Sequence, residues 1–67
     1  MLSNETKKAI MAFLNGEKIR DKGFGNRKIY YYLDNEGIVR DNDETYLDGL
    51  QIHPGIEYEI YKDKKDL

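Results

Sequence analysis

The 67-residue sequence contains no cysteine, no tryptophan and only one proline. The lack of cysteine excludes disulfides and thiolate metal sites, and it is compatible with a cytoplasmic protein. No apolar run approaches the roughly 20 residues that a membrane-spanning helix needs. The opening MLSNETKKAI is not followed by the hydrophobic region of a signal peptide. We therefore expect a cytoplasmic protein that does not associate with a membrane.

Side chains suited to catalysis are also scarce. The single histidine, His53, falls in a segment typical of a loop, and helix capping accounts for the single serine, Ser3. No set of nucleophile, base and orienting group can be assembled from them. DNDET at 41–45 resembles the start of a calcium loop, but Tyr46 and Ile52 stand where that loop needs glycine and glutamate. We expect no catalytic residue, no metal site, no cofactor and no enzymatic activity.

The spacing of apolar residues predicts an α+β fold in which one N-terminal helix packs on a small antiparallel sheet of three to four strands. Ser3 or Asn4 can cap the helix, and Gly16 can end it. Its apolar stripe comprises Leu2, Thr6, Ala9, Ile10, Phe13 and Leu14. The expected layout is a single domain over 1–67, with the helix at about 4–15, the sheet at about 17–62 and a frayed tail at 63–67.

Beyond Gly16 the apolar period changes to two, which is typical of strands. Asp34 and Gly37 favour a turn, so residues 27–40 are expected to form a hairpin. The candidate strands are 17–20, 27–33, 38–40 and 56–62.

Three consecutive tyrosines lie in the second of these strands. Tyr31 is expected to share a face with Leu33, whereas Tyr30 and Tyr32 point the opposite way. Since one helix covers only one face, we expect Tyr30 and Tyr32 to be partly exposed or buried by another subunit.

Charge is unevenly distributed along the chain. The net charge of −2 argues against a nucleic-acid binder of the basic type. Residues 17–28 carry five basic and two acidic side chains, whereas 34–48 carry six acidic side chains and one basic. Such asymmetry can pair two protomers or separate a ligand site from a solvated rim.

The basic region surrounds the sequence RDKGFGNRK at 20–28. Its glycines allow backbone amides to approach an anion, and its basic residues add positive charge. Phe24 can stack on a purine base. The alternative is an exposed basic turn whose Phe24 folds back onto the helix as part of the core.

Several motifs resemble one family of small phage proteins. Gly16, Lys18, Ile19, Lys22, Gly23 and Phe24 match the pattern G-K-K-[VI]-x-R-K-G-W, and Glu57, Tyr58 and Ile60 match a closing D-W-x-[IV]. IYYYLDNEGIVRDNDE is similar to the run Y-I-Y-L-D-x-D-G-x-I-x-D-E-D. The chain thus resembles the Thoeris anti-defence proteins of the cyclic-nucleotide sponge type and related prophage products. Phe24 and Tyr58 replace the two tryptophans of these motifs.

The resemblance implies a phage or prophage counter-defence protein in the cytoplasm of a bacterial host. Such sponges are homo-oligomers that hold an immune signalling nucleotide, without cleaving it, in pockets where protomers meet. On this hypothesis the ligand is an adenine-containing cyclic nucleotide. Phosphate contacts would come from Arg20, Lys22, Arg27 and Lys28, with Gly23 allowing close approach. Phe24 with Tyr30 or Tyr58 would flank the base, and Asn26 would read a base edge or the ribose.

Two other functions stay open at this point. Exposed tyrosines are good interface anchors, so the protein could instead bind and block a host defence enzyme directly. Single-stranded nucleic-acid binding through the tyrosines and basic loop is a third possibility, but the net charge of −2 argues against it.

Overall fold

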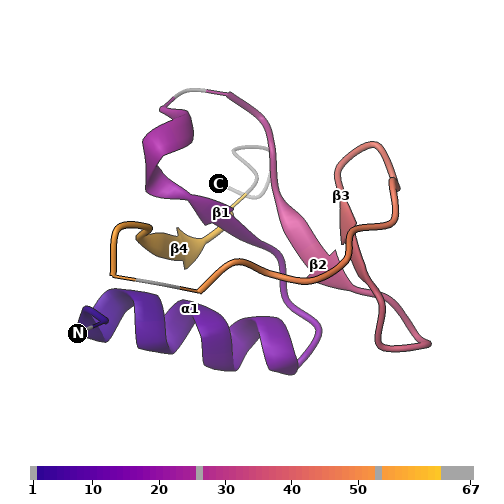
Figure 1. Cartoon of the computed structure of the whole chain (residues 1–67), viewed down its shortest axis with the longest axis horizontal. Coiled ribbons are helices and arrows are strands. Elements are labelled where there is room, and N and C mark those ends of the chain that lie inside the picture. Colours follow the sequence, from indigo (N-terminus) through magenta and orange to yellow (C-terminus); the bar gives the residue numbers. More distant parts are fainter. Residues whose placement is uncertain (1, 26, 53, 63–67) are drawn as a thin grey trace.

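The computed structural model describes residues 2–25, 27–52 and 54–62, and it confirms the predicted α+β fold (Figure 1). One helix is followed by a sheet of four antiparallel strands in the spatial order β3-β2-β1-β4. No helix in the described ranges is long and apolar enough to cross a membrane. The tail at 63–67 lies outside the described residues. The elements are α1 (Asn4–Leu14), β1 (Ile19–Asp21), the 3-10 turn η1 (Lys22–Phe24), β2 (Tyr31–Leu33), β3 (Val39–Asp41) and β4 (Tyr58–Ile60).

Helix α1 begins and ends close to its predicted limits. The Ser3 hydroxyl caps its first turn by accepting a hydrogen bond from the Thr6 amide at 3.1 Å. At the other end Gly16, with φ of 91°, turns the chain toward β1. Leu14 was expected on the buried stripe but is 67% exposed. It follows the buried Phe13 directly and therefore lies about 100° away around the helix.

The paired strands are shorter than predicted. Ile19 of β1 pairs with Tyr31, the first residue of β2, whereas Arg20 and Asp21 pair with β4. Residues 27–30 therefore precede the paired part of β2. The predicted hairpin is confirmed, since β2 and β3 pair along their length around a turn at 34–38.

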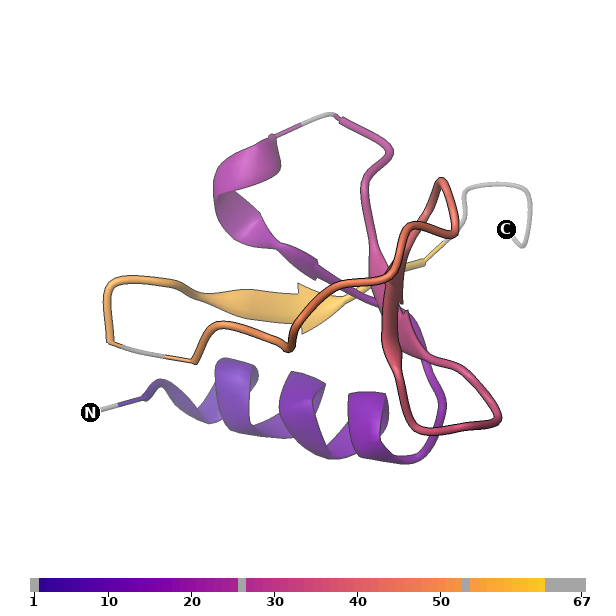
Figure 2. The same ribbon diagram turned by 45° about the vertical axis from the view of Figure 1, so that its right-hand side comes forward.

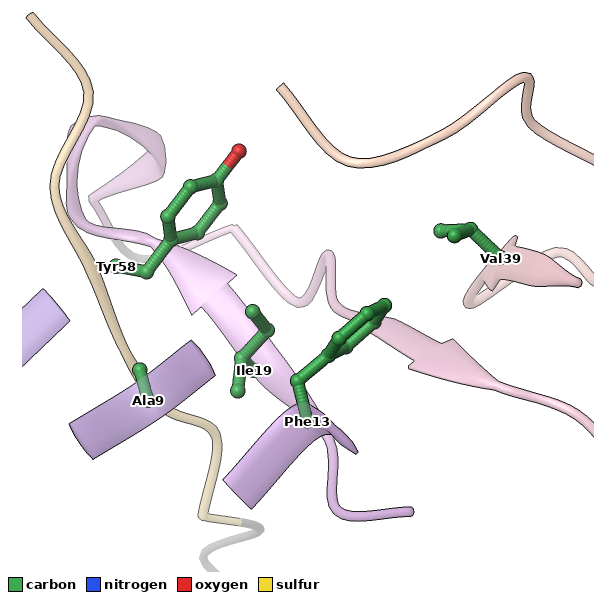
Figure 3. Close-up of a cluster of buried hydrophobic side chains, with 5 residues drawn as sticks. All are labelled: Ala9, Phe13, Ile19, Val39 and Tyr58. Carbon is green, nitrogen blue, oxygen red and sulfur yellow. The ribbon is translucent and has the colours of Figure 1, made fainter. Parts of the chain in front are cut away.

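Helix α1 and the 42–52 connection lie on the same side of the sheet (Figures 1 and 2). The core between α1 and the sheet is formed by Ala9, Phe13, Ile19, Val39 and Tyr58 (Figure 3). Thr6, only 1% exposed, joins the two layers, because its Oγ1 accepts a hydrogen bond from the Tyr58 amide of β4 at 3.0 Å. The helix is thus fixed to β4 by a directional bond as well as by apolar contact.

The β2–β3 turn is organised by the Asp34 carboxylate. One carboxylate oxygen accepts from the amides of Glu36, at 2.8 Å, and Ile38, at 3.0 Å. The other accepts from Arg40 Nε at 2.7 Å. The Ile38 amide, followed by the Arg40 and Glu36 bonds, holds the pKa of Asp34 below its ordinary value of 3.8.

We expect this carboxylate to make stability depend on pH in acid. Because the pKa of Asp34 is lower in the folded state than in the unfolded state, its carboxylate stabilises the fold fully at pH values above the unfolded pKa, near 3.8. This stabilisation is lost as the pH falls through the lower pKa of the folded state. In thermal melts between pH 7 and pH 2, Asp34→Asn should lower Tm at pH 7 and flatten the acid limb. The control is Asp43→Asn, because Asp43 is exposed and its carboxylate forms no hydrogen bond or ion pair among the described residues. Parallel acid limbs for the parent and Asp34→Asn would contradict the assignment.

Candidate functional site

Three tyrosines gather on the sheet face opposite α1. Tyr30 and Tyr32 point away from the core because Tyr31, between them, packs against it. The ring centroids of Tyr30 and Tyr32 are 6.1 Å apart, and those of Tyr30 and Tyr61 are 4.9 Å apart. All three are half-buried, and helix α1 covers the other face of the sheet (Figures 1 and 2). We call Tyr30, Tyr32 and Tyr61 the tyrosine face.

One cation lies directly on this face. The Lys18 ammonium sits 4.7 Å from the centroid of the Tyr30 ring, within the range of a cation–π contact. Lys18 makes no ion pair in the part of the chain that the structure describes. Its charge is therefore available to an anion that lies against Tyr30.

Two arginines at the margins of the tyrosine face are already engaged. Arg20 Nε lies 3.6 Å from Glu59 Oε2 across the β1–β4 pair. Arg40 pairs with Asp34 and also donates to the Tyr46 hydroxyl at 2.6 Å, with its guanidinium 4.1 Å from the Tyr46 ring centroid. These partners leave Lys18 as the less constrained positive charge near the rings.

The glycine loop is held by its own side chains. The Asp21 carboxylate caps η1 by accepting from the Gly23 amide at 2.8 Å. The Arg20 guanidinium donates to the Gly25 carbonyl, and Gly25 adopts a φ of 62°, which favours glycine. The Gly23 amide, a predicted anion contact, thus donates within the chain, and Arg20 serves to hold the loop.

The other predicted basic residues fall into two groups. The Lys22 ammonium lies 2.5 Å from Glu5 of α1, and this hydrogen-bonded pair raises the pKa of Lys22. Arg27 and Lys28 are exposed, and neither has an ion pair within residues 2–25, 27–52 and 54–62. Asn26, predicted to read a base edge or the ribose, lies outside the described residues. Arg27 and Lys28 are therefore the predicted contacts that remain free for phosphate.

The predicted aromatic contacts are divided between the two faces of the sheet. Phe24 is half-buried, with its ring 6.1 Å from that of Tyr31, on the core side of the sheet. Tyr58 is 3% exposed and donates from its hydroxyl to the Gln51 carbonyl at 2.6 Å. Figure 3 shows that hydroxyl at the edge of the core cluster. Phe24 and Tyr30 therefore lie on opposite faces of the sheet, which disfavours the first predicted pair, whereas Phe24 and Tyr58 share the core side and stay a predicted pair.

A hollow of about 290 Å³ opens on the core side of the sheet, beside the 46–51 connection. Two cross-strand pairs place carboxylates near its tyrosines, since Asp21 is in register with Tyr58 and Asp41 with Tyr31. The residues that line the hollow are Asp21, Tyr31, Leu47, Gly49, Leu50, Gln51, Ile56 and Tyr58. We call it the aspartate–tyrosine pocket.

The phenol groups of this pocket have raised pKa values. Burial, followed by the charges of Asp21 and Asp41, raises the pKa of Tyr31. Burial, with smaller effects of Tyr31 and Asp21, raises the pKa of Tyr58 to about 12. Both phenols are therefore neutral near pH 7, and the carboxylates disfavour an anionic ligand in this pocket.

Sequence reasoning missed part of both surfaces. It separated Tyr30 and Tyr32 from Tyr31 by alternation, but it did not add Tyr61 or Lys18 to the same face. The position of Tyr61 could have been predicted, because the alternation of residues 56–62 places it on the opposite face from Tyr58. The position of Asp21 beside Tyr58 could not have been predicted from the sequence, because it depends on the register of β1 with β4.

No group of three or more histidine, aspartate or glutamate side chains suited to a metal ion occurs among the described residues. DNDET forms a turn in which the Asp41 carboxylate accepts from the amides of Asp43 and Thr45.

Comparisons with protein-family models, curated proteins and solved structures found no match. The resemblance to the sponge family therefore stays a prediction from sequence motifs.

Proposed function

We propose that this protein acts by binding, and that its ligand is an anionic nucleotide that lies on the tyrosine face. The observation that carries the proposal is the tilted contact of Tyr30 with Tyr61, together with the Lys18 ammonium over the Tyr30 ring. A base can stack on an aromatic ring whatever its edge pattern, and a cation beside the ring attracts phosphate.

The tyrosine face suits an anion better than the aspartate–tyrosine pocket does. Lys18 is exposed on that face, and the exposed Arg27 and Lys28 belong to the segment that leads into β2. The pocket instead holds the Asp21 carboxylate beside two neutral phenols. Coulomb repulsion would therefore oppose phosphate in the pocket, whereas Lys18, Arg27 and Lys28 would attract it toward the tyrosine face.

In its specific form, we propose a phage or prophage counter-defence role in which the ligand is an adenine-containing cyclic nucleotide that is sequestered and released intact. Removing a signal present near micromolar levels needs a nanomolar dissociation constant, about −12 kcal/mol. Stacking contributes only about 1–3 kcal/mol per base, and the tyrosine face is open. Tight sequestration therefore requires a second copy of the chain to close over the ligand, as a homo-oligomer.

A second function is favoured by the same open surface. Tyrosine and arginine are enriched among the residues that dominate protein interfaces, and the tyrosine face is bordered by Arg20 and Arg40. A face of this kind also fits direct binding to a host defence enzyme. The protein would then act as an inhibitor through contact alone.

Calorimetric titration with cyclic dinucleotides and cyclic ADP-ribose isomers tests the first function, with light scattering on the same sample to give the mass. We expect nanomolar, stoichiometric binding by an oligomer and recovery of intact nucleotide after heating. Absence of binding across the panel would contradict the nucleotide proposal. A stable complex with a purified host defence enzyme, unaffected by nucleotide, would support the inhibitor instead.

A further inference from the structure

The aspartate–tyrosine pocket combines negative charge, aromatic rings and an apolar wall. Asp21 stands in register with Tyr58 on the neighbouring strand, and Asp41 stands in register with Tyr31. Directly opposed residues of antiparallel strands have Cβ atoms about 4.5–5.5 Å apart. The Asp21 side chain lines the pocket together with Tyr31 and Tyr58, whereas Asp41 lies outside the lining. Neither Asp21 nor Asp41 has an ion pair with any described residue.

Such a lining is suited to a cation that carries an alkyl chain. Aromatic faces attract cations, most strongly where water is displaced, and the Asp21 carboxylate supplies the opposite charge. Leu47, Leu50 and Ile56 provide apolar surface for a hydrocarbon stem. The volume of about 290 Å³ lies at the lower end of the range of about 300–1,000 Å³ for ligand pockets. The ligand is therefore small, or it is a single side chain.

The hydrogen bonds already made in the pocket favour an ammonium over a guanidinium. One Asp21 oxygen accepts from the Gly23 amide, so the fork of two parallel bonds that a guanidinium prefers would compete with that bond. A compact ammonium with three donors can use the other oxygen. The Tyr58 hydroxyl directs its proton to the Gln51 carbonyl, which leaves its oxygen to act as an acceptor.

The geometry points to the aspartate–tyrosine pocket as a binding site for a primary alkylammonium, either a free amine or the side chain of a lysine on a partner protein. This site is independent of the proposed nucleotide function. It lies on the other side of the sheet from the tyrosine face, and its ligand has the opposite charge. Failure of either proposal therefore leaves the other standing.

The test is an NMR titration of protein carrying ¹³C-labelled tyrosine rings, with n-butylammonium chloride as the probe. We expect saturable shifts of the Tyr31 and Tyr58 ring signals and smaller shifts of Tyr30 and Tyr61. Bound cation should also lower the pKa of Tyr58 from about 12, because a positive charge stabilises the phenolate. Two controls show whether the charge is required. Sodium chloride at equal ionic strength tests for a salt effect, and neutral n-pentanol should bind at least fivefold more weakly than n-butylammonium.

Asp21→Asn removes the negative charge of the pocket but keeps the cap of η1, because the asparagine side-chain oxygen can still accept from the Gly23 amide. We expect it to weaken n-butylammonium binding at least fivefold, whereas Asp43→Asn, which removes the same charge from an exposed turn, leaves it unchanged. Equal binding by Asp21→Asn and the parent, or equal binding of n-pentanol, would overturn the proposal. Methylguanidinium that binds more tightly than n-butylammonium would also overturn it.

A second titration distinguishes the two sources of the ammonium group. A short peptide with one central lysine and blocked termini is compared with n-butylammonium, and its norleucine analogue serves as the control. Tighter binding of the lysine peptide supports a protein partner, and tighter binding of the free amine supports a small molecule. Peptide binding that is retained by the norleucine analogue would contradict an ammonium site.

Discussion

Replacing Tyr30 with alanine is expected to weaken nucleotide binding roughly fivefold to 150-fold, since loss of one base–aromatic stack costs about 1–3 kcal/mol. Tyr30 has the largest effect of the three tyrosines because its ring contacts Tyr32, Tyr61 and the Lys18 ammonium. Tyr30→Phe retains the ring and should bind nearly as well as the parent. Calorimetry with the tightest nucleotide of the panel gives the dissociation constants.

The contribution of the Lys18 charge to nucleotide binding is measured by comparing Lys18→Ala with Lys7→Ala. Lys7 is an exposed lysine of α1, on the opposite side of the sheet from the tyrosine face, so it is a matched control for the loss of one positive charge. We expect weaker binding for Lys18→Ala, with an effect that declines as salt rises, and parent-like binding for Lys7→Ala. If Phe24→Ala abolished binding while Tyr30→Ala and Lys18→Ala did not, the ligand would lie in the glycine loop instead.

The largest expected effect on stability comes from Thr6→Val. Valine keeps the shape of threonine, but it removes the hydroxyl that accepts from the amide of the buried Tyr58. An unsatisfied buried donor costs about 1–3 kcal/mol. A chain of this size has a total unfolding free energy of only about 3–10 kcal/mol, on the usual per-residue scale. Chemical denaturation should therefore show a much lower midpoint for Thr6→Val.

Thr6→Ser is the matched variant, because it keeps the hydroxyl and removes one methyl group. Transfer of that methyl costs about 0.8 kcal/mol, so the midpoint alone does not separate the two effects. Hydrogen exchange of the Tyr58 amide does, and we expect protection to persist in Thr6→Ser and to fall in Thr6→Val. Equal protection in both variants would show that the Thr6 bond contributes little.

We thus propose that two surfaces of the protein bind ligands of opposite charge. The tyrosine face offers rings and Lys18 to a flat anion, and the aspartate–tyrosine pocket offers rings and Asp21 to a cation. The four-stranded sheet separates them, because the side chains of Tyr30 and Tyr32 point away from that of Tyr31. A single segment, Tyr30 to Tyr32, supplies aromatic rings to both sites.

The candidate residues show where sequence reasoning stopped. Arg27 and Lys28 are exposed, as charged residues of a polar loop usually are, and their role as phosphate contacts stays a prediction. Tyr58 was assigned to the same site as Tyr30, because a sequence motif does not give the face on which its aromatic residue lies. Its burial under the Gln51 segment follows from where β4 packs on α1.

The sequence by itself determined the local features of this protein: the helix that Ser3 caps, the hairpin around Asp34 and Gly37, and the separation of Tyr30 and Tyr32 from Tyr31. Each depends on side-chain periodicity or turn chemistry over a few residues. Only the tertiary structure decided that β1 lies between β2 and β4, and this order brings Asp21 beside Tyr58 and Tyr61 beside Tyr30. Pairing of strands far apart in the chain is selected by the packing of the whole core, so no local pattern specifies it.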